Sequence, residues 1–388
     1  MIRYLCHRAK TAFFAVAALA LETVLLAGTG LGAETIFRQS VMVEMRYDSN
    51  SGIEPASLRP ESDYVFTLFP RFDLSQDSGL IKLALFYRPG GSFYFRNQDL
   101  NTVSHFAGID ADLMVSETTG LKASDRFNYT KDMREADPNA VQTMRTGTTT
   151  NEITAEVTHE PAPGLSAKAV LSRRTQEFDN SALIDTQIDG LALSAAKAVS
   201  QGLTLNADYM FTGFSFDTGS SSESHSLLAG FEAGITRNTN LNASAGAVFS
   251  PDTDRDRYDF SATAELTSAF KNSSLGLGYS RGVSSSSGLV DLRSLNSRYT
   301  FRYSYNLSGE TVTTFSGGYS RALSRPDAVI DITSYDANLS ISWRPSDRFS
   351  ANAGYRRSKQ WSHGTIGTDM GRDNIFVSLD FVPFERRL

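Results

Sequence analysis

The residue types that most often do chemistry in proteins are few and scattered in this chain. Its 388 residues include five histidines and a single cysteine, Cys6. His105, His159, His225 and His363 have no partners at the spacing of a metal site. We therefore interpret them as isolated imidazoles that bind hydroxyl groups or lie in loops, and we predict neither a metal site nor a cofactor.

One Gly-x-Ser-x-Gly match occurs, at 278–282. The serine nucleophile of such a motif stands on a sharp turn between a strand and a helix. Here the match runs from a strand-like segment into a serine-rich loop with no helical pattern behind it, so we interpret it as a chance match. A hydrolase that assembles its serine, histidine and acid from distant strands stays open as an alternative.

A series of alternate aspartates resembles the opening of a calcium loop. It consists of Asp252, Asp254 and Asp256. Arg257 stands where the loop needs a glycine, and no acid follows at the closing position. The series is therefore interpreted as a solvated acidic loop, and the chain is predicted not to be an enzyme.

Charge and composition exclude two further classes of protein. Lys and Arg total 37 against 43 Asp and Glu, and the charges are scattered along the chain. No basic surface for nucleic acid is predicted. With 40% hydrophobic residues, the chain also differs from disordered proteins.

The N-terminus has the layout of a secretory signal. Basic residues among the first ten precede an apolar stretch at 11–26, and small residues follow up to Ala33. This order predicts a signal peptide at 1–33, cleaved near Ala33. An uncleaved anchor is disfavoured because the apolar stretch is short for a membrane span. The remainder, 34–388, shows no linker or shift in composition and is predicted to be one domain.

After the signal, the hydrophobic pattern has a period of two. At 299–307, aromatic residues and a leucine alternate with polar side chains. Similar alternation recurs at 258–267, 152–158 and 203–212. Successive side chains of a strand point to opposite faces of its sheet. Each segment therefore predicts a strand with one apolar and one polar face.

Two kinds of connection alternate between these segments. Short ones with the residues of tight hairpin turns stand at 76–79, 117–120, 161–164, 200–202, 237–240, 271–274, 308–310 and 345–348. Longer ones run over 48–61, 89–101, 131–145, 177–181, 217–224, 251–256, 282–288, 323–327 and 360–370. These turns and loops would join about 18 strands, with both chain ends on the side of the short turns.

This layout predicts an all-β fold. We expect a closed antiparallel transmembrane β-barrel in the outer membrane of a Gram-negative bacterium, with short periplasmic turns, longer extracellular loops and lipids around it. A soluble sandwich or propeller is disfavoured because strands average about five or six residues there. A helical membrane protein is disfavoured because no later apolar run is long enough to span a bilayer.

The last strand carries a second signal. Its alternating apolar positions, a pattern that the barrel assembly machinery of outer-membrane proteins reads, are Ile375, Val377, Leu379 and Phe381. The chain continues beyond Phe381, and Pro383 is not expected to extend a ladder of strand hydrogen bonds. Phe384 is therefore an alternative end of the assembly signal.

If the aromatic face of each strand meets lipid, its polar face lines the interior. The polar residues predicted to face the lumen are Glu44, Arg46, Arg71, Asp73, Lys122, Arg126, Glu152, Glu156, Lys168, Asn206, Asp208, Asp259, Glu265, Arg298, Arg302, Asp336, Asn338, Asn352 and Arg356. Both charge signs are interspersed, which favours a neutral or weakly charged hydrophilic solute over a filter of one sign. Barrels of about 16 to 18 strands leave an aqueous channel, and the loops at 48–61 and 131–145 are long enough to fold into it.

The start of the mature chain resembles a known family. Segment 41–50 reads Val-Met-Val-Glu-Met-Arg-Tyr-Asp-Ser-Asn, and segment 62–71 reads Ser-Asp-Tyr-Val-Phe-Thr-Leu-Phe-Pro-Arg. Together with the turn and strand at 119–129, they resemble the β-barrel porin type 2 family. Ser49 stands where the family usually has a second acid. The likeness is specific only over roughly the first hundred residues, and the family defines no functional residues that could be carried over.

The resemblance implies an outer-membrane conduit for a secreted polysaccharide, working beside a periplasmic polysaccharide export protein. The residues themselves leave two other functions open. One is a general or solute-specific diffusion porin. The other is a barrel that encloses a periplasmic partner, such as a multihaem cytochrome.

Overall fold

The computed structural model describes residues 34–132, 144–251, 257–285, 288–289, 291, 293–324 and 329–387. The predicted signal peptide at 1–33 and the aspartate series at 252–256 lie outside the described residues. Within the described part of the chain, no helix has the length and apolar character of a membrane span.

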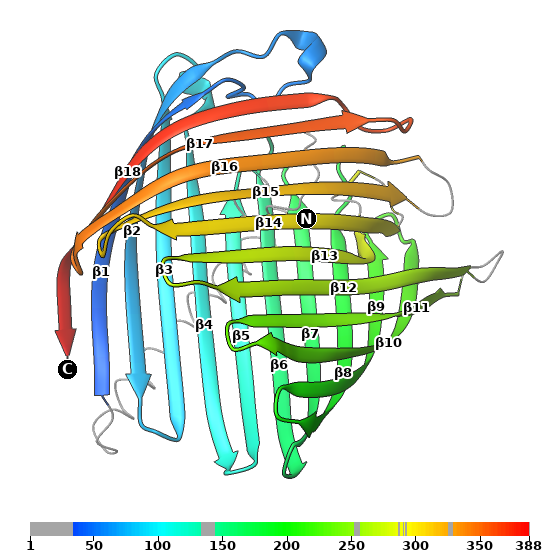
Figure 1. Cartoon of the computed structure of the whole chain (residues 1–388). Helices are drawn as coiled ribbons and strands as arrows, with labels where there is room; N and C mark the ends of the chain where they lie inside the picture. The colour runs from blue at the N-terminus through cyan, green and yellow to red at the C-terminus, as the bar shows by residue number, and fades with distance from the viewer. Residues whose placement is uncertain are drawn as a thin grey trace.

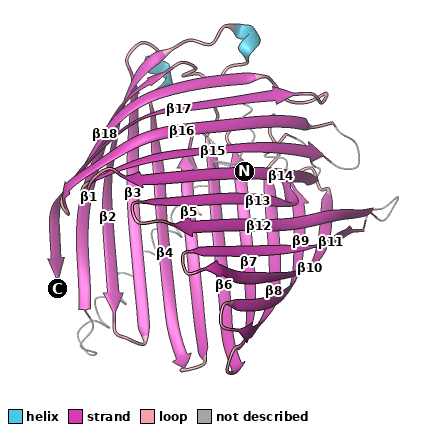
Figure 2. Ribbon diagram, in the orientation of Figure 1, coloured by secondary structure: helices cyan, strands magenta, loops and turns pink. Residues whose placement is uncertain are grey.

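The described chain is built almost entirely of β-strands (Figure 2). The strands are β1 (Glu34–Asp48), β2 (Asp63–Asp77), β3 (Ile81–Tyr94), β4 (Thr102–Ser116), β5 (Thr119–Thr130), β6 (Thr148–Ala162), β7 (Leu165–Phe178), β8 (Thr186–Ser200), β9 (Leu203–Phe216), β10 (Ser221–Thr236), β11 (Thr239–Ser250), β12 (Arg257–Ala269), β13 (Ser273–Ser285), β14 (Arg293–Asn306), β15 (Thr311–Ser324), β16 (Asp331–Ser346), β17 (Phe349–Ser362) and β18 (Met370–Arg387). Two short 3-10 helices, η1 (Ala56–Leu58) and η2 (Gln98–Leu100), lie in the first two long loops.

The strands close into a barrel. Each pairs antiparallel with the next along the chain, and β18 pairs with β1, so the 18-stranded sheet has no free edge. Figure 1 shows β12 to β17 on the near wall crossing the strands of the far wall, as expected of strands that tilt around a barrel. The predicted fold, strand number and alternation of tight turns with longer loops are confirmed.

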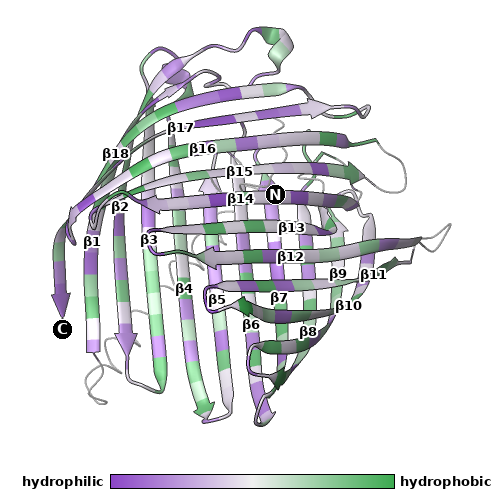
Figure 3. Ribbon diagram, in the orientation of Figure 1, coloured by the Kyte–Doolittle hydropathy of each residue, from purple (hydrophilic) through white to green (hydrophobic). Residues whose placement is uncertain are grey.

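The alternating sequence explains why these segments form strands. Figure 3 shows hydrophilic and hydrophobic residues following one another along single strands. On the apolar face, aromatic rings of neighbouring strands contact one another: the centroids of Tyr279 and Tyr299 are 4.8 Å apart, and those of Tyr299 and Tyr319 are 6.2 Å apart. Cross-strand aromatic pairs of this kind stabilise the register of a sheet.

The loop predicted at 89–101 begins too early, because β3 continues to Tyr94. The ladder between β2 and β3 is interrupted between the pair Leu68–Gly91 and the pair Phe72–Tyr87. Pro70 and Pro89 both lie in this interruption, and proline has no amide hydrogen to donate. Placing two prolines in one gap lets both strands continue on either side.

The prediction that Pro383 would end the last ladder is also wrong. The register shifts between the pair Val41–Phe381 and the pair Gln39–Phe384, where β18 has two residues, Val382 and Pro383, opposite the single Ser40 of β1. Pro383 thus lies in a bulge of β18, and the pairing resumes beyond it. Phe37 and Phe384 contact across this extension, with ring centroids 6.1 Å apart. The reading of the apolar positions up to Phe381 by an assembly machinery stays a prediction.

Candidate functional site

The polar face of the sheet is the inner wall of the barrel. Residues that pair directly across a ladder point to the same side of a sheet, so the register carries each face around all 18 strands. One cavity of about 660 Å³ is lined from β6 to β15, by Glu152, Asp208 and Arg298 among others. Because β6 and β15 are far apart around the closed barrel, side chains from both can line one cavity only if that cavity lies inside the barrel.

The register puts every polar residue predicted to face the lumen on this inner wall. Cross-strand pairs from one strand to the next show that these residues share one face of the sheet. Lys122, for example, pairs with Glu156, and Arg356 pairs with Asn338. Their role in passing a solute stays a prediction and belongs to the proposal below.

Some inner-wall charges satisfy one another. Lys168 Nζ lies 2.7 Å from Glu156 Oε2. Arg126 Nη2 donates to both carboxylate oxygens of Asp110, at 2.5 and 2.6 Å. These groups are partly exposed, so each pair contributes only about 0–1 kcal/mol to stability. Asp110 was not among the predicted lumen residues. It pairs with Ser124, two positions from Lys122, and therefore points to the same side of the sheet as Lys122.

Charge on the inner wall is sorted by strand. From β8 to β13, the charged side chains that the structure describes on this face are all acidic: Asp208, Glu232, Asp259 and Glu265. From β14 to β18, arginines predominate over acids, with Arg298, Arg302, Arg344, Arg356 and Arg372 beside Asp336, Asp380 and Glu385. Both signs therefore occur together on β1 to β7 and, with an excess of arginine, on β14 to β18, whereas the described charges on β8 to β13 have one sign.

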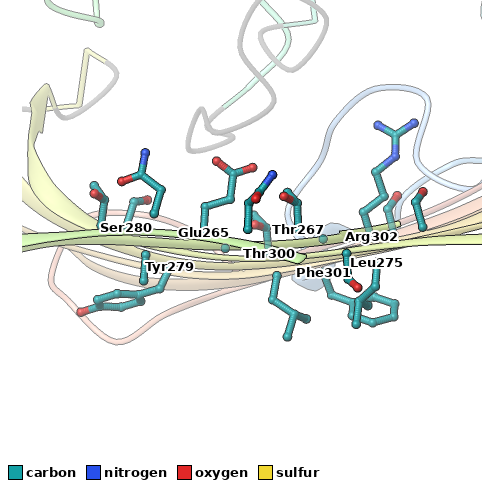
Figure 4. A pocket seen from close by; sticks show the side chains of 18 of the residues that line it. Glu265, Thr267, Leu275, Tyr279, Ser280, Thr300, Phe301 and Arg302 are labelled. Atoms are coloured by element: carbon teal, nitrogen blue, oxygen red, sulfur yellow. The ribbon is translucent and has the colours of Figure 1, made fainter. Parts of the chain in front are cut away.

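A hollow of about 840 Å³ lies where the acidic and basic arcs meet, lined by β11 to β16. In Figure 4, Glu265, Thr300 and Arg302 point to one side of the sheet, whereas Tyr279 and Phe301 point to the other. The first group is on the inner wall and the second faces outward, which follows the period of two along β12 to β14.

The floor of this hollow is made of glycine. Gly276 and Gly278 of β13 lie on the inner face between Glu265 and Arg302. A Cβ at Gly278 would overlap Thr300 Oγ1, whereas one at Gly276 would meet only the Cβ of Arg302 at 3.9 Å and its carbonyl oxygen at 4.0 Å. Gly276 therefore leaves open space beside Arg302, and Gly278 makes room for the Thr300 hydroxyl.

An arginine and aromatic cluster on the opposite part of the inner wall escaped the sequence analysis. The Arg88 guanidinium carbon lies 5.1 Å from the ring centroid of Phe69 and 4.4 Å from that of Phe106. Gly90 makes room for this packing, because a Cβ there would overlap the Phe69 ring. The assumption that aromatic side chains face lipid is therefore wrong on β2 to β4.

A buried ionic cluster lies at the end of the barrel that carries the long loops. Arg372 of β18 donates to Asp48 of β1 from Nε at 3.0 Å and from Nη2 at 2.6 Å. Its Nη1 donates to Asp132 at 2.5 Å. Burial raises the pKa of Asp132, but the charge and hydrogen bonds of Arg372 outweigh burial and lower this pKa to about 2.

Three of the long loops, at 48–61, 89–101 and 131–145, meet through Arg145 at the same end of the barrel. Arg145 donates to the Tyr94 hydroxyl at 2.7 Å, to the carbonyl of Ser51 at 3.2 Å and to the carbonyl of Leu100 at 3.1 Å. Ser51 is fully buried. The loop at 48–61 and the described part of the loop at 131–145 are thus joined through one side chain.

The candidate chemical motifs do not assemble into a reactive site among the described residues. His105 and His225 contact tyrosine hydroxyls at 2.9 Å, and His159 contacts a threonine hydroxyl at 3.0 Å. The serine motif at 278–282 lies wholly inside β13, with no turn at Ser280. Within the described ranges there is no group of three or more metal-binding side chains.

No family model matches the chain, and no curated protein matches it. Several solved structures are similar to it. The outer membrane protein OpdK from Pseudomonas aeruginosa is 12% identical, with a TM-score of 0.47 over 90% of this chain and 99% of that one. OpdQ from the same species is 12% identical, with a TM-score of 0.48 over 91% and 98%. OccAB2 from Acinetobacter baumannii is 9% identical, with a TM-score of 0.48 over 92% and 98%.

None of these structures is described as a component of polysaccharide export. The expectation that came with the family resemblance gains no support from them or from the family models.

Proposed function

We propose that this protein is an outer-membrane porin through which small hydrophilic solutes diffuse. The observation that carries the proposal is a closed 18-stranded sheet whose inner wall is polar and whose outer wall is apolar. Closure matters because a bilayer offers no partner to an unpaired backbone group, and a barrel pairs all of them between strands.

The outer wall suits contact with lipid. Leu339, Ile341 and Phe315 on neighbouring strands are each 45–49% exposed, although they are large and apolar. Such exposure over many strands would be a liability in water. Four residues beyond Phe315 along β15, the neighbouring tilted rings of Tyr299 and Tyr319 fit the aromatic girdle that flanks the apolar band of a transmembrane barrel.

The inner wall suits water and hydrated solutes. Eighteen strands enclose more space than their own inward side chains fill. The inner wall carries arginines, carboxylates, amides and hydroxyls, and its hollows reach about 840 Å³. A solute that crosses this lumen keeps hydrogen-bonding partners throughout, which favours passage of polar molecules over apolar ones.

The proposal includes export through the cell envelope. A signal peptide cleaved after Ala33 would leave Glu34, the first residue of β1, at the mature N-terminus. N-terminal sequencing of the protein extracted from outer membranes should therefore begin within a few residues of Glu34. A chain that still begins at Met1 would contradict this part of the proposal.

Conductance of the purified protein tests the pore itself. Reconstituted alone into a planar bilayer, the protein should give stepwise, long-lived current increases in 1 M potassium chloride. The same preparation unfolded by heat should give none. A folded, inserted barrel that passes no current would overturn the proposal and would instead favour a channel that opens only with a partner.

A further inference from the structure

We infer that the hollow between Glu265 and Arg302 binds zwitterionic solutes of short-peptide length. The inference deepens the proposed porin function, because it names the class of solute that the inner wall recognises. It rests on the position of two charges, on their lack of partners and on the glycine floor between them.

The register fixes how far apart the two charges stand. Glu265 pairs with Gly278, and Arg302 pairs with Gly276, so the two residues are two strands and two positions apart. With strands about 4.8 Å apart and a rise of about 3.3 Å per residue, their Cα atoms are roughly 12 Å apart. Figure 4 shows both side chains rising from the floor on the same side.

Neither charge is neutralised by the protein. Glu265 and Arg302 are both exposed, and neither forms a hydrogen bond or ion pair within the described part of the chain. Their neighbour Arg298 differs, because its Nη2 lies 3.7 Å from Asp336 Oδ1. The carboxylate and the guanidinium, on the two strands that flank β13, are thus left to bind opposite charges on a solute.

The floor and sides of the hollow suit a peptide backbone. Gly276 leaves the space above it unfilled, and the Thr300 hydroxyl lies against Gly278. Asn240 and Asn242 of β11 line the same hollow and offer amide groups. An extended tripeptide spans about 10 Å, so its ammonium group reaches Glu265 while its carboxylate reaches Arg302.

Solutes with one charge fit this site less well. An anion that reaches Arg302 leaves Glu265 without a partner, and a cation that reaches Glu265 leaves Arg302 without one. A single amino acid is too short to span both. Each lost contact is an exposed charge pair, so we expect a loss of roughly twofold to fivefold in affinity for each.

Equilibrium titration of the folded barrel in detergent micelles tests the inference without relying on conduction. The probes are triglycine, N-acetyltriglycine, triglycine amide and glycine. Triglycine should bind roughly fivefold more tightly than each of the other three. Equal binding of triglycine and its two singly charged analogues would overturn the inference.

Substitutions distinguish the contributions of the two charges and of the glycine floor to triglycine binding. Glu265→Gln should lower triglycine binding to the level of N-acetyltriglycine, and Arg302→Gln should lower it to the level of triglycine amide. Gly276→Leu should weaken binding while both charges remain. The matched controls are Glu152→Gln, Arg356→Gln and Gly371→Leu, which change lumen charges outside the hollow or a glycine with open space around it. Site variants that bind triglycine as tightly as the controls would also overturn the inference.

The binding and conductance experiments test the site and the pore separately. A barrel that conducts but does not discriminate between triglycine and its analogues removes this site and leaves the porin proposal standing. A barrel that discriminates but does not conduct removes the porin proposal and leaves the site. Circular dichroism of every variant checks that the barrel is folded before either result is interpreted.

Discussion

Arg372 of β18 donates a 2.5 Å hydrogen bond to Asp132, which follows β5 by two residues and lies 240 positions away in the chain. The same guanidinium holds Asp48 at the end of β1. One buried cation therefore ties the start of the β5–β6 loop to the seam where the first and last strands close the barrel. Both carboxylates are at least nine-tenths buried, so each depends on this arginine.

Replacing Arg372 with methionine should destabilise the barrel by about 3 kcal/mol, because two buried carboxylates lose the guanidinium that donates hydrogen bonds to both of them. The measurement is the free energy of unfolding in urea, with the protein refolded in lipid vesicles. Arg38→Met is the matched control, since Arg38 lies 3.9 Å from Glu385 and both side chains are nearly half exposed. We expect that control to change stability by less than about 0.5 kcal/mol. Equal losses in the two variants would show that the buried cluster contributes nothing special.

The same cluster predicts a dependence on acid. The pKa of Asp132 is about 2 in the folded protein, below its ordinary value of 3.8. Because the folded pKa is the lower one, the stability from Asp132 is fully present above about pH 4 and is lost as the pH falls toward 2. The difference in unfolding free energy between the wild type and Asp132→Asn should therefore shrink between these two pH values. A difference that stays constant from pH 7 to pH 2 would contradict this assignment.

Local sequence signals were enough to predict the strands but not the contacts across the barrel. Period-two alternation and turn residues are patterns that extend over about ten neighbouring residues. The predicted turns at 117–120 and 200–202 therefore agree with the structure. The bond from Arg372 to Asp132 arises only when β18 closes on β1, and no local pattern encodes it.

Two features of the inner wall departed from prediction, for different physical reasons. Aromatic residues were predicted to face lipid, but Phe69 and Phe106 face inward, where Arg88 packs against both rings and Gly90 leaves space. The sorting of charge into arcs was missed because it depends on position around the barrel, which the order of residues along the chain does not display. The alternation of polar and apolar residues, in contrast, correctly predicted that Glu265 and Arg302 lie on the same face of the sheet.

Backbone packing predicts a sharp intolerance at Gly246 of β11. A Cβ there would overlap the backbone carbonyl oxygen of Leu227 on β10, which has no flexible end to move aside. Gly246→Ala should therefore lower the unfolding free energy by about 1–3 kcal/mol. Gly371→Ala is the control, because nothing lies within 4 Å of a Cβ at that position. If both variants unfold at the same urea concentration, the close approach of β10 and β11 is not as tight as the structure has it.

Adjacent residues on β16 test which face meets lipid. Leu339 is 48% exposed on the outer wall near the middle of the strand, and Ser340 is the next residue, on the inner wall. A lysine that faces the middle of the bilayer costs about 2–4 kcal/mol, whereas one that faces an aqueous lumen keeps its hydration. Leu339→Lys should therefore lower the unfolding free energy in lipid vesicles by that amount, and Ser340→Lys should change it little. The reverse order would mean that the face of Ser340 meets lipid. Glu265 and Arg302 would then face lipid as well, because the cross-strand pairs from β12 to β16 put them on the same face as Ser340.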